Sequence, residues 1–397
     1  MIYVFEDQYA LNLEPLTLTW ATFELRCGAY THLERIRRVV SDKPLSLVVR
    51  PEMAAVVQER YPDLPVNPEQ VVAGLWLNGT ALWDEESFQL LDAKHAHMMQ
   101  EERLVGGYLP AYDGRAFRDS LMRGEQHSFN PTEYEGPTLL HYLWDHFLTN
   151  GERLTADFDR WYRSAARSAL PRGVEVVGDG GVYLGKDVTI DPAVTLDIRH
   201  GPVIIEDGTT IASHSVIAGP TYLGSKCKVW PFAFLEEVAL GPVCRVMGQV
   251  EGTIMQGYTN KQHDGFLGHA YLGSWINLGA GTTNSDLKNN YGPVKVLVNG
   301  QTVDTGKTFI GMFMGDHAKT AIGTLFNTGT RVGVAANVFG PVTPPKVVPS
   351  FAWGGDGQER YDLEKCLETM ATVKGRRGQE LTQAERDLFK RLYEEAQ

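Results

Sequence analysis

The sequence predicts an α/β domain followed by a left-handed parallel β-helix and a short helical tail. From Leu184 to about Gly340 an aliphatic residue returns every six positions, whereas residues 1 to about 135 alternate between short apolar runs and helical patterns. A helix would repeat at about 3.6 residues and an exposed strand at about two. A six-residue period is typical of short strands joined by tight turns, with the aliphatic side chain stacked inside each coil.

The six-residue period is the stronger signal. Its members, interrupted by a three-residue insertion at 199–201, are Leu184, Ile190, Leu196, Ile205, Ile211, Ile217, Leu223, Val229 and Leu235. The alternative is an antiparallel sandwich, which should show alternating strands and hairpin dipeptides. Neither is prominent. The period breaks between Gly241 and Phe266 and then resumes.

The α/β prediction for residues 1–135 depends on the order of elements. We expect strands and helices in alternation, which favours a parallel sheet covered by helices. The expected elements are a strand at 2–5, a helix at 31–40, a strand at 45–49, a helix at 52–60 and a strand at 71–77.

The remaining regions are a helical linker at 136–172, the β-helix at 173–348 and a tail at 349–397. Pro171 and Gly173 mark the start of the β-helix. In the tail, five residues share one helical face, Gly375 is a stop signal, and Thr382 with Glu385 has the spacing of a capping box. The five residues are Leu363, Cys366, Leu367, Met370 and Val373.

Composition and net charge limit the kinds of molecule that we expect this protein to bind. The chain has 397 residues and a net charge of -12, which argues against a nucleic acid or an anionic membrane as partner. The four cysteines form no close pairs, so neither a zinc site nor a disulfide framework is indicated. With no signal peptide and no apolar run of about 20 residues, we expect a cytoplasmic protein without a membrane span.

The segment from His263 to Thr282 resembles a known family. It contains His263, Leu267-Gly268, Leu272-Gly273 and the turn Asn277-Leu278-Gly279-Ala280-Gly281-Thr282. This pattern is similar to the acetyltransferase half of the bacterial bifunctional enzymes that acetylate glucosamine 1-phosphate and couple the product to UTP. The likeness is close over about twenty residues and loose over the rest of the β-helix.

The resemblance implies a role for each matching residue. His263 matches the general base, which would take the proton of an ammonium before the amine attacks acetyl-CoA. Asn277 matches a residue that contacts the amino-sugar, and the turn at Gly279, Ala280 and Gly281 would meet the cofactor. Backbone amides would stabilise the oxyanion. Further candidates for binding the substrate are Lys261, Tyr291 and Lys295.

Two departures put the substrate in doubt. Phe266 stands where the family has a tyrosine, and Asn284-Ser285-Asp286-Leu287 replaces an Asn-Tyr-Asp-Gly turn. His269 and His317 are interpreted as structural histidines. A zinc-dependent carbonic anhydrase would also be a left-handed β-helix, but His263 and His269 lack the spacing expected of its ligands.

The N-terminal domain resembles the sugar-nucleotidyltransferase-like domains fused to such β-helices, through Phe5-Glu6-Asp7 and residues 15–28. It lacks their glycine-rich loop, and Trp20 and Thr80 stand where arginine is usual, which should weaken triphosphate binding. Candidates for Mg²⁺ ligands are Glu6, Asp7 and Asp84, with solvated acids as the alternative. Candidates for nucleotide contacts are Arg26, Lys43, Asn78 and Gly79.

We therefore predict an acetyl-CoA-dependent N-acetyltransferase that acts on an amino-sugar phosphate or nucleotide-amino-sugar, with weak or lost nucleotidyl transfer. Sites between neighbouring β-helices would require a homotrimer, and apolar residues near the coil corners favour one. Those residues are Trp230, Phe232, Phe234 and Trp275. The alternative is a non-catalytic trimeric scaffold that binds a sugar nucleotide.

Overall fold

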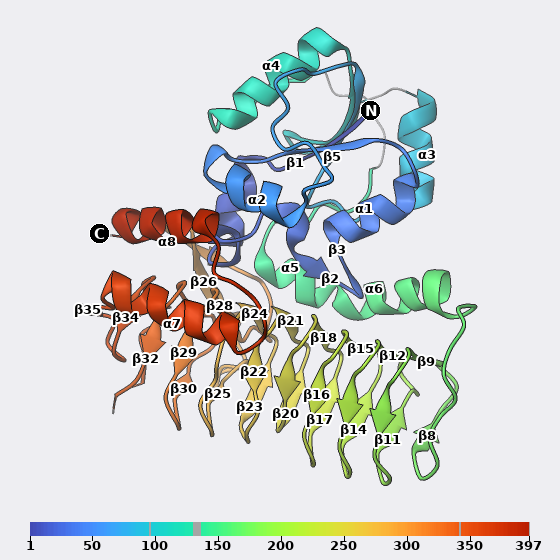
Figure 1. Ribbon diagram of the computed structural model, residues 1–397, viewed down its shortest axis with the longest axis vertical. Helices are drawn as coiled ribbons and strands as arrows, with labels where there is room; N and C mark the ends of the chain where they lie inside the picture. Colours follow the sequence, from blue (N-terminus) through green and yellow to red (C-terminus); the bar gives the residue numbers. More distant parts are fainter. Residues whose placement is uncertain (95–96, 130–135, 341–342, 397) are drawn as a thin grey trace. The chain divides into compact units, whose positions relative to one another are not determined.

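The computed structural model describes residues 1–94, 97–129, 136–340 and 343–396, and Figure 1 traces its elements. The chain forms two compact units. One contains Met1–Leu25, Tyr30–Tyr142 and Thr382–Phe389, and the other contains Arg26–Ala29, Leu143–Leu381 and Lys390–Gln397. The domain boundary expected at residue 135 lies outside the described residues.

The first unit is built on a five-stranded mixed sheet with the strand order β4-β1-β5-β7-β6. Strand β1 pairs in parallel with β4 and β5, as the order of the first elements predicts. Two strands beyond the three that were expected make the sheet mixed, because β7 is antiparallel to β5 and to β6. Only two residues join β6 to β7, and so short a connection requires antiparallel strands. The strands are β1 (Ile2–Phe5), β4 (Leu45–Val48), β5 (Gly74–Asn78), β6 (His97–Gln100) and β7 (Arg103–Leu109), with the short β3 at Tyr30–Thr31.

Helices of this unit begin close to where the sequence predicts. Thr31 caps α1, since its hydroxyl accepts from the Glu34 amide and the Glu34 carboxylate accepts from the Thr31 amide. Phe117 of α4 packs edge-on against Trp76, which stacks on Tyr3 at 4.5 Å. The helices are α1 (His32–Val40), α2 (Ala54–Arg60), α3 (Glu85–Lys94) and α4 (Ala111–Met122), with 3₁₀ turns at Gln8–Leu13, Leu16–Leu18, Thr22–Glu24 and Pro51–Met53.

The second unit contains a parallel β-helix, which confirms the fold predicted from the six-residue period. Successive coils pair in parallel along three sides, so an antiparallel sandwich is excluded. All nine aliphatic residues of the period are buried inside the coils. One side is a nine-stranded sheet: β9 (Val182–Leu184), β12 (Val203–Ile205), β15 (Thr221–Leu223), β18 (Ala239–Leu240), β21 (Ile254–Gly257), β24 (Tyr271–Ser274), β28 (Met312–Met314), β31 (Thr330–Val332) and β33 (Val347–Val348).

The other two sides carry shorter strands. The second side comprises β8 (Glu175–Val177), β11 (Thr195–Asp197), β14 (Val216–Ala218), β17 (Phe234–Glu236), β20 (Gln249–Glu251) and β23 (Phe266–Gly268), with the pair β25 (Thr283–Asn284) and β30 (Leu325–Phe326). The third comprises β10 (Thr189–Ile190), β13 (Thr210–Ile211), β16 (Lys228–Val229), β19 (Arg245–Val246) and β22 (Asn260–Lys261), then β29 (Lys319–Thr320), β32 (Asn337–Val338), β34 (Ala352–Trp353) and β35 (Glu359–Arg360).

The six-residue sequence pattern breaks between Gly241 and Phe266, but the coil does not. Strands β19 to β22 continue the coil through this segment in register with their neighbours. The inward residues are Val246, Val250, Met255 and Lys261, all of them buried. Their spacing shortens to four or five residues at the turns, and the last of them is a lysine. The sequence pattern is therefore lost although the coil is not.

Helical segments and one hairpin complete this unit. Helices α5 (Leu143–Leu148) and α6 (Asn150–Asp157) and a π-turn at Phe158–Tyr162 precede the β-helix, and residues of β2 (Arg26–Cys27) pack with them. The hairpin of β26 (Lys295–Val298) and β27 (Gln301–Asp304) projects between two coils. The tail forms α7 (Leu363–Gly375) and α8 (Gln383–Glu395), and the predicted capping box at Thr382 and Glu385 is confirmed.

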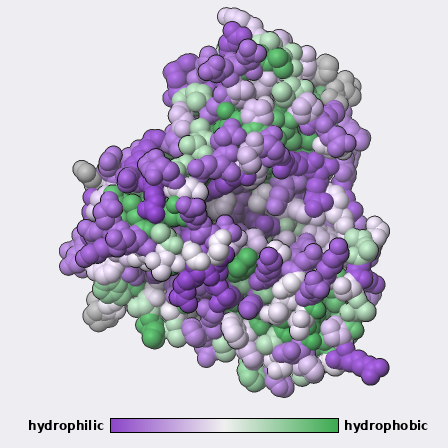
Figure 2. All heavy atoms as spheres, in the orientation of Figure 1, coloured by the Kyte–Doolittle hydropathy of each residue, from purple (hydrophilic) through white to green (hydrophobic). Residues whose placement is uncertain are grey.

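Hydrophilic residues cover most of the face shown in Figure 2, with small hydrophobic groups between them. In the described part of the chain, none of the helices has the length and apolar character needed to span a bilayer.

Candidate functional site

His263 lies in the turn between β22 and β23, and its side chain is exposed. The glycine-rich turn of the next coil stacks directly on this turn, because the Gly281 amide donates to the Asp264 carbonyl at 3.0 Å. The coil after that continues the stack, with the Gly323 amide donating to the Ala280 carbonyl at 2.7 Å. Stacking of successive coils thus places the two parts of the sequence motif side by side.

The glycines of the motif are explained by this stacking. A Cβ atom on Gly279 would lie 2.5 Å from the carbonyl group of Ala321, and Gly281 has a φ of +73°, which side chains rarely tolerate. The Gly279 amide donates to the hydroxyl and carbonyl oxygens of Thr320. Since the amides of Gly279 and Gly281 are both used between coils, neither is free to bind the cofactor or the oxyanion as expected.

Lys261 is not positioned to contact a substrate, contrary to the expectation. It occupies the inward position that Val246 fills one coil earlier, and it is 1 % exposed. Its amine donates to the carbonyl oxygens of Met247 (3.2 Å) and His263. Burial lowers the pKa of Lys261 from 10.5 to about 8. The lysine therefore supports the turn that carries His263 from inside the coil.

Asn277 is exposed and lines a cavity of about 310 Å³ on the third side of the β-helix. It follows Asn260 and precedes Lys319 in a ladder of outward residues on successive coils. The cavity is closed on its other side by the end of α7. Its other lining residues are Arg245, Tyr258, Gln262, Trp275, Val373, Arg376 and Arg377.

Tyr291 and Lys295 are not brought to this cavity. Tyr291 is 73 % exposed in the loop after the glycine-rich turn, and Lys295 is exposed on β26. Neither belongs to the lining of the cavity. Their predicted contact with the substrate is not supported by these positions, because the hairpin takes this segment out of the coil.

A histidine and aspartate pair was missed. The Nδ1 atom of His269 lies 2.8 Å from a carboxylate oxygen of Asp286, on the next coil. His269 also stacks on Phe309 at 5.3 Å. The two partners are 17 residues apart, which is the length of this coil, so the coil length is the only signal that could have paired them.

His317 and Trp275 are buried at one coil corner, where they form an aromatic stack with the half-buried Tyr258. Trp275 stacks on Tyr258 at 4.2 Å and lies parallel to His317 at 6.0 Å. Burial, and then Lys319 and Lys374, hold the pKa of His317 well below its ordinary value. Trp275 is only 9 % exposed and so needs no partner subunit to cover it, whereas Phe232 is 68 % exposed.

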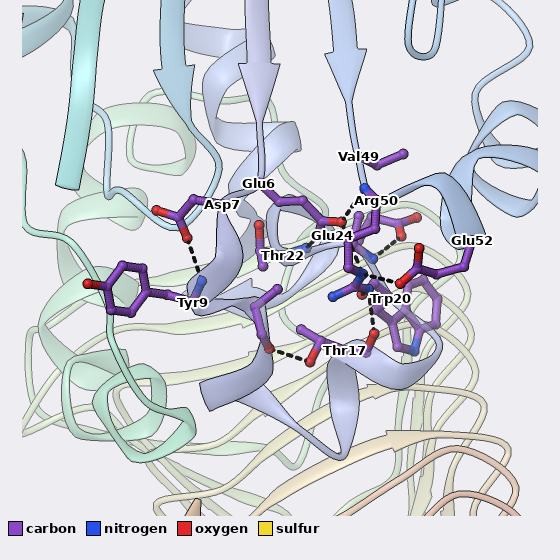
Figure 3. A network of polar contacts seen from close by, with 12 residues as sticks. Glu6, Asp7, Tyr9, Thr17, Trp20, Thr22, Glu24, Val49, Arg50 and Glu52 are labelled. Atoms are coloured by element: carbon purple, nitrogen blue, oxygen red, sulfur yellow. Dashed lines mark hydrogen bonds and ion pairs between the residues drawn. The ribbon is translucent and has the colours of Figure 1, made fainter. Parts of the chain in front are cut away.

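Glu6 and Asp7 of the first unit already have hydrogen-bond and ion-pair partners (Figure 3). One Glu6 oxygen accepts from the Arg50 amide at 2.9 Å and the other from the Thr22 amide at 3.0 Å. Asp7 forms a two-point pair with Arg103 at 2.9 and 3.1 Å. Burial raises the pKa of Glu6, while Arg50 opposes that rise.

The third predicted Mg²⁺ ligand, Asp84, also has partners within the first unit. Asp84 accepts from the amide and hydroxyl of Ser87 at the start of α3. Within the described ranges, no three His, Cys, Asp or Glu residues are grouped so that they could hold a metal ion. Glu6, Asp7 and Asp84 each have hydrogen-bond partners within the first unit.

The predicted nucleotide contacts are likewise dispersed. Asn78 donates to Asp7 at 3.0 Å, and a Cβ atom on the adjacent Gly79 would lie 2.8 Å from Phe23. Lys43 is exposed over the Phe88 ring, and Arg26 belongs to the second unit, where its guanidinium donates to the Ala29 carbonyl.

An arginine from another part of the chain lies beside each of the two positions where the sequence lacks the usual arginine. Each of these arginines is paired with a carboxylate. Arg60 lies 4.1 Å from the centre of the Trp20 ring and pairs with Glu24 at 2.9 Å. Arg103 donates to the Thr80 hydroxyl while it pairs with Asp7. A cavity beside Asp7 and Arg103 has a volume of about 20 Å³, which is room for about one water molecule.

Comparisons with known proteins agree with the two resemblances drawn from the sequence. Residues 2–165 match the family described as sugar nucleotidyl transferase. The bifunctional protein GlmU of Cupriavidus taiwanensis is 28% identical over 167 residues, covering 35% of this chain and 36% of that protein. The bifunctional sugar-1-phosphate nucleotidylyltransferase/acetyltransferase of Sulfurisphaera tokodaii is 30% identical over 146 residues, covering 35% of each.

The chain thus spans about a third of the length of these curated relatives. A longer match, to the bifunctional protein GlmU of Synechococcus elongatus, is 28% identical over 229 residues and covers 53% of this chain and 45% of that protein. The solved structure of an Arabidopsis UDP-N-acetylglucosamine acyltransferase matches at 14% identity with a TM-score of 0.29, covering 51% of this chain and 77% of that chain. The β-helix is established by the strand pairing of this chain itself. The resemblance to the bifunctional enzyme family is confirmed.

Proposed function

We propose that this protein transfers an acyl group from acetyl-CoA, or a related acyl-CoA, to the amine of an amino-sugar phosphate or nucleotide-amino-sugar. One observation carries the proposal: the exposed His263 lies on a turn that is stacked against the glycine-rich turn and supported from inside by Lys261. The names of the relatives support the same chemistry. In this proposal Asn277, beside a positively charged cavity, contacts the sugar.

The chemistry requires one base and one acyl donor. The imidazole of His263 takes a proton from the substrate ammonium, and the free amine attacks the thioester carbonyl carbon. The carbon–sulfur bond then breaks, and the departing thiolate takes a proton. Imidazole suits this task because it titrates near neutral pH.

The first unit does not fit nucleotidyl transfer. Its Glu6 and Asp7 carboxylates are paired with Arg50 and Arg103, and in the described part of the chain no three potential metal ligands are grouped. We therefore include weak or lost nucleotidyl transfer in the proposal, and the unit would serve as a binding or structural module.

A homotrimeric, cytoplasmic form is part of the proposal. Exposed apolar side chains lie on several coils of the β-helix: Trp230, Phe232, Ile322, Leu325 and Phe339. Exposed groups of this kind are typical of a surface that packs against another subunit.

The test is the acetyl-transfer rate of His263→Ala with a panel of amino-sugar phosphates. We expect the rate to fall by roughly 10² to 10⁴, with little change in acetyl-CoA affinity, because a base that meets the amine need not hold the donor. Asn277→Ala should instead raise the Michaelis constant for the sugar. His200→Ala, an exposed histidine on an earlier coil, is the control and should keep full activity.

The scaffold alternative gives a different result. If the wild-type protein shows no saturable binding of acetyl-CoA by calorimetry, the acyltransferase proposal is wrong and the scaffold stands. Full activity in His263→Ala would also reject His263 as the base.

A further inference from the structure

The cavity beside Asn277 is lined by four positively charged side chains. Arg245 and Lys319 reach it from the outward ladder of the β-helix, while Arg376 and Arg377 reach it from the end of α7, which runs along the β-helix in Figure 1. No Asp or Glu belongs to the described lining. Among the described residues, none of these four cations pairs with a carboxylate; Arg377 donates to the Asn260 amide oxygen at 3.1 Å and Lys319 to the His317 carbonyl at 2.9 Å.

Interaction with the helix dipole explains only two of these four cations. Cations near the C-terminus of a helix interact favourably with its dipole, which accounts for Arg376 and Arg377. It does not account for Arg245 and Lys319 on the facing sheet. Four cations around one cavity repel one another, and the pKa of Arg377 is lowered by burial and then by Arg245 and Arg376. Grouping these four cations is therefore electrostatically unfavourable unless an anion offsets their repulsion.

Neutral groups in the cavity suit a small polar ligand. The amides of Asn260 and Asn277 face it, and the Tyr258 ring, which stacks on Trp275, forms part of its wall. Arginine forks bind phosphate oxygens at two points, and aromatic rings stack on planar groups. A volume of about 310 Å³ is larger than one phosphate needs.

We propose that this cavity is a binding site for the phosphate groups of a small phosphate ester, held between the β-helix and the tail helix. Two sources have this chemistry: the 3′-phosphoadenosine end of an acyl-CoA and a sugar phosphate. The choice between these sources rests on the proposed acyl transfer, whereas the anion site itself does not. On this view α7 is part of a ligand site and more than a cap on the β-helix.

The experiment is calorimetric titration of the full chain with pyrophosphate, followed by competition with 3′,5′-adenosine bisphosphate or glucosamine 1-phosphate. We expect saturable binding that weakens with added salt. Arg245→Gln and Arg377→Gln should each weaken it by about tenfold or more, the scale of one charge-assisted hydrogen bond. Lys186→Gln, an exposed lysine elsewhere on the β-helix, should leave it unchanged.

Thermal unfolding distinguishes a lost site from a lost fold. Pyrophosphate should raise the unfolding temperature of the wild-type protein and of Lys186→Gln. At the same pyrophosphate concentration the rise should be smaller for Arg245→Gln, whose unfolding temperature without ligand should be unchanged or higher because a repulsion is removed. Competition by only one of the two esters identifies the source.

Two results would overturn the proposal: no saturable pyrophosphate binding at millimolar concentration, or binding that is unaffected by all variants of the cavity. Failure of the two proposals can be told apart. Pyrophosphate binding that depends on Arg245 in a protein without acyl transfer would reject only the proposed function. Acyl transfer that depends on His263 without pyrophosphate binding would reject only the anion site.

Discussion

Replacing Lys261 by methionine tests whether a lysine is buried inside the β-helix. Its amine has only the carbonyl oxygens of Met247 and His263 as partners among the described residues, and its pKa is lowered from 10.5 to about 8. With about 1.36 kcal/mol for each pH unit, this interval corresponds to about 3.4 kcal/mol. Methionine removes that penalty but leaves two buried acceptors without a donor, at about 1–3 kcal/mol each.

The direction of the pH dependence follows from how many protons the folded and unfolded states bind. The unfolded chain holds the Lys261 proton up to pH 10.5, whereas the folded chain releases it near pH 8. Below pH 8 both states are protonated, and folding carries the full penalty. Between about pH 8 and 10.5 the unfolded state binds more protons, so the lysine's contribution to stability rises with pH.

The assay is urea unfolding of the wild type and Lys261→Met at pH 7, 8.5 and 10.5. We expect the wild type to gain stability relative to the variant by about 3 kcal/mol across this range, which is the scale of the pKa difference. Lys228→Met is the matched control, because Lys228 points outward on β16 two coils earlier. A wild-type-to-variant difference that stays constant from pH 7 to 10.5 would refute the buried position of Lys261.

Two further predictions concern the first unit and the assembly. The wild-type protein should release no measurable pyrophosphate from a nucleoside triphosphate and a sugar 1-phosphate with Mg²⁺, because Asp7 is paired with Arg103; rapid release in a phosphate-coupled assay would show that the carboxylates rearrange. Light scattering should give the mass of a trimer, and Phe232→Ser with Ile322→Ser should weaken association by at least about tenfold, since two exposed apolar side chains lose their buried area. Leu170→Ser is the control, and a wild-type monomer at micromolar concentration would contradict the prediction.

Local patterns fixed most of the fold. The period from Leu184 to Leu235 defines the inner face of each coil, and all of these residues are buried. The capping boxes at Thr31 and Thr382 were within reach of the sequence because their partners lie three residues away. After Gly241 the sequence pattern is lost, because shorter spacings and an inward lysine hide a coil that the backbone continues.

The candidate site also has a part that the sequence predicted and a part that it did not. The motif itself identified His263, Asn277 and the glycine-rich turn, and their neighbourhood follows once a coil of 17 residues is stacked on the next. The roles expected for Lys261, Tyr291 and Lys295 were wrong or unsupported, because a sequence does not tell which residue of a coil points inward or where a hairpin leaves it.

The sequence by itself determined the β-helix, the α/β domain and the position of the motif, since each depends on residues that are close in the chain. Only the tertiary structure decided which distant side chains meet. Arg245 and Arg377 line one cavity, although 131 intervening residues separate them, and His269 finds Asp286 on the next coil. These contacts between distant residues depend on the length of each coil and on where the tail helix packs. The charge of a cavity likewise depends on which side chains the folded chain brings together.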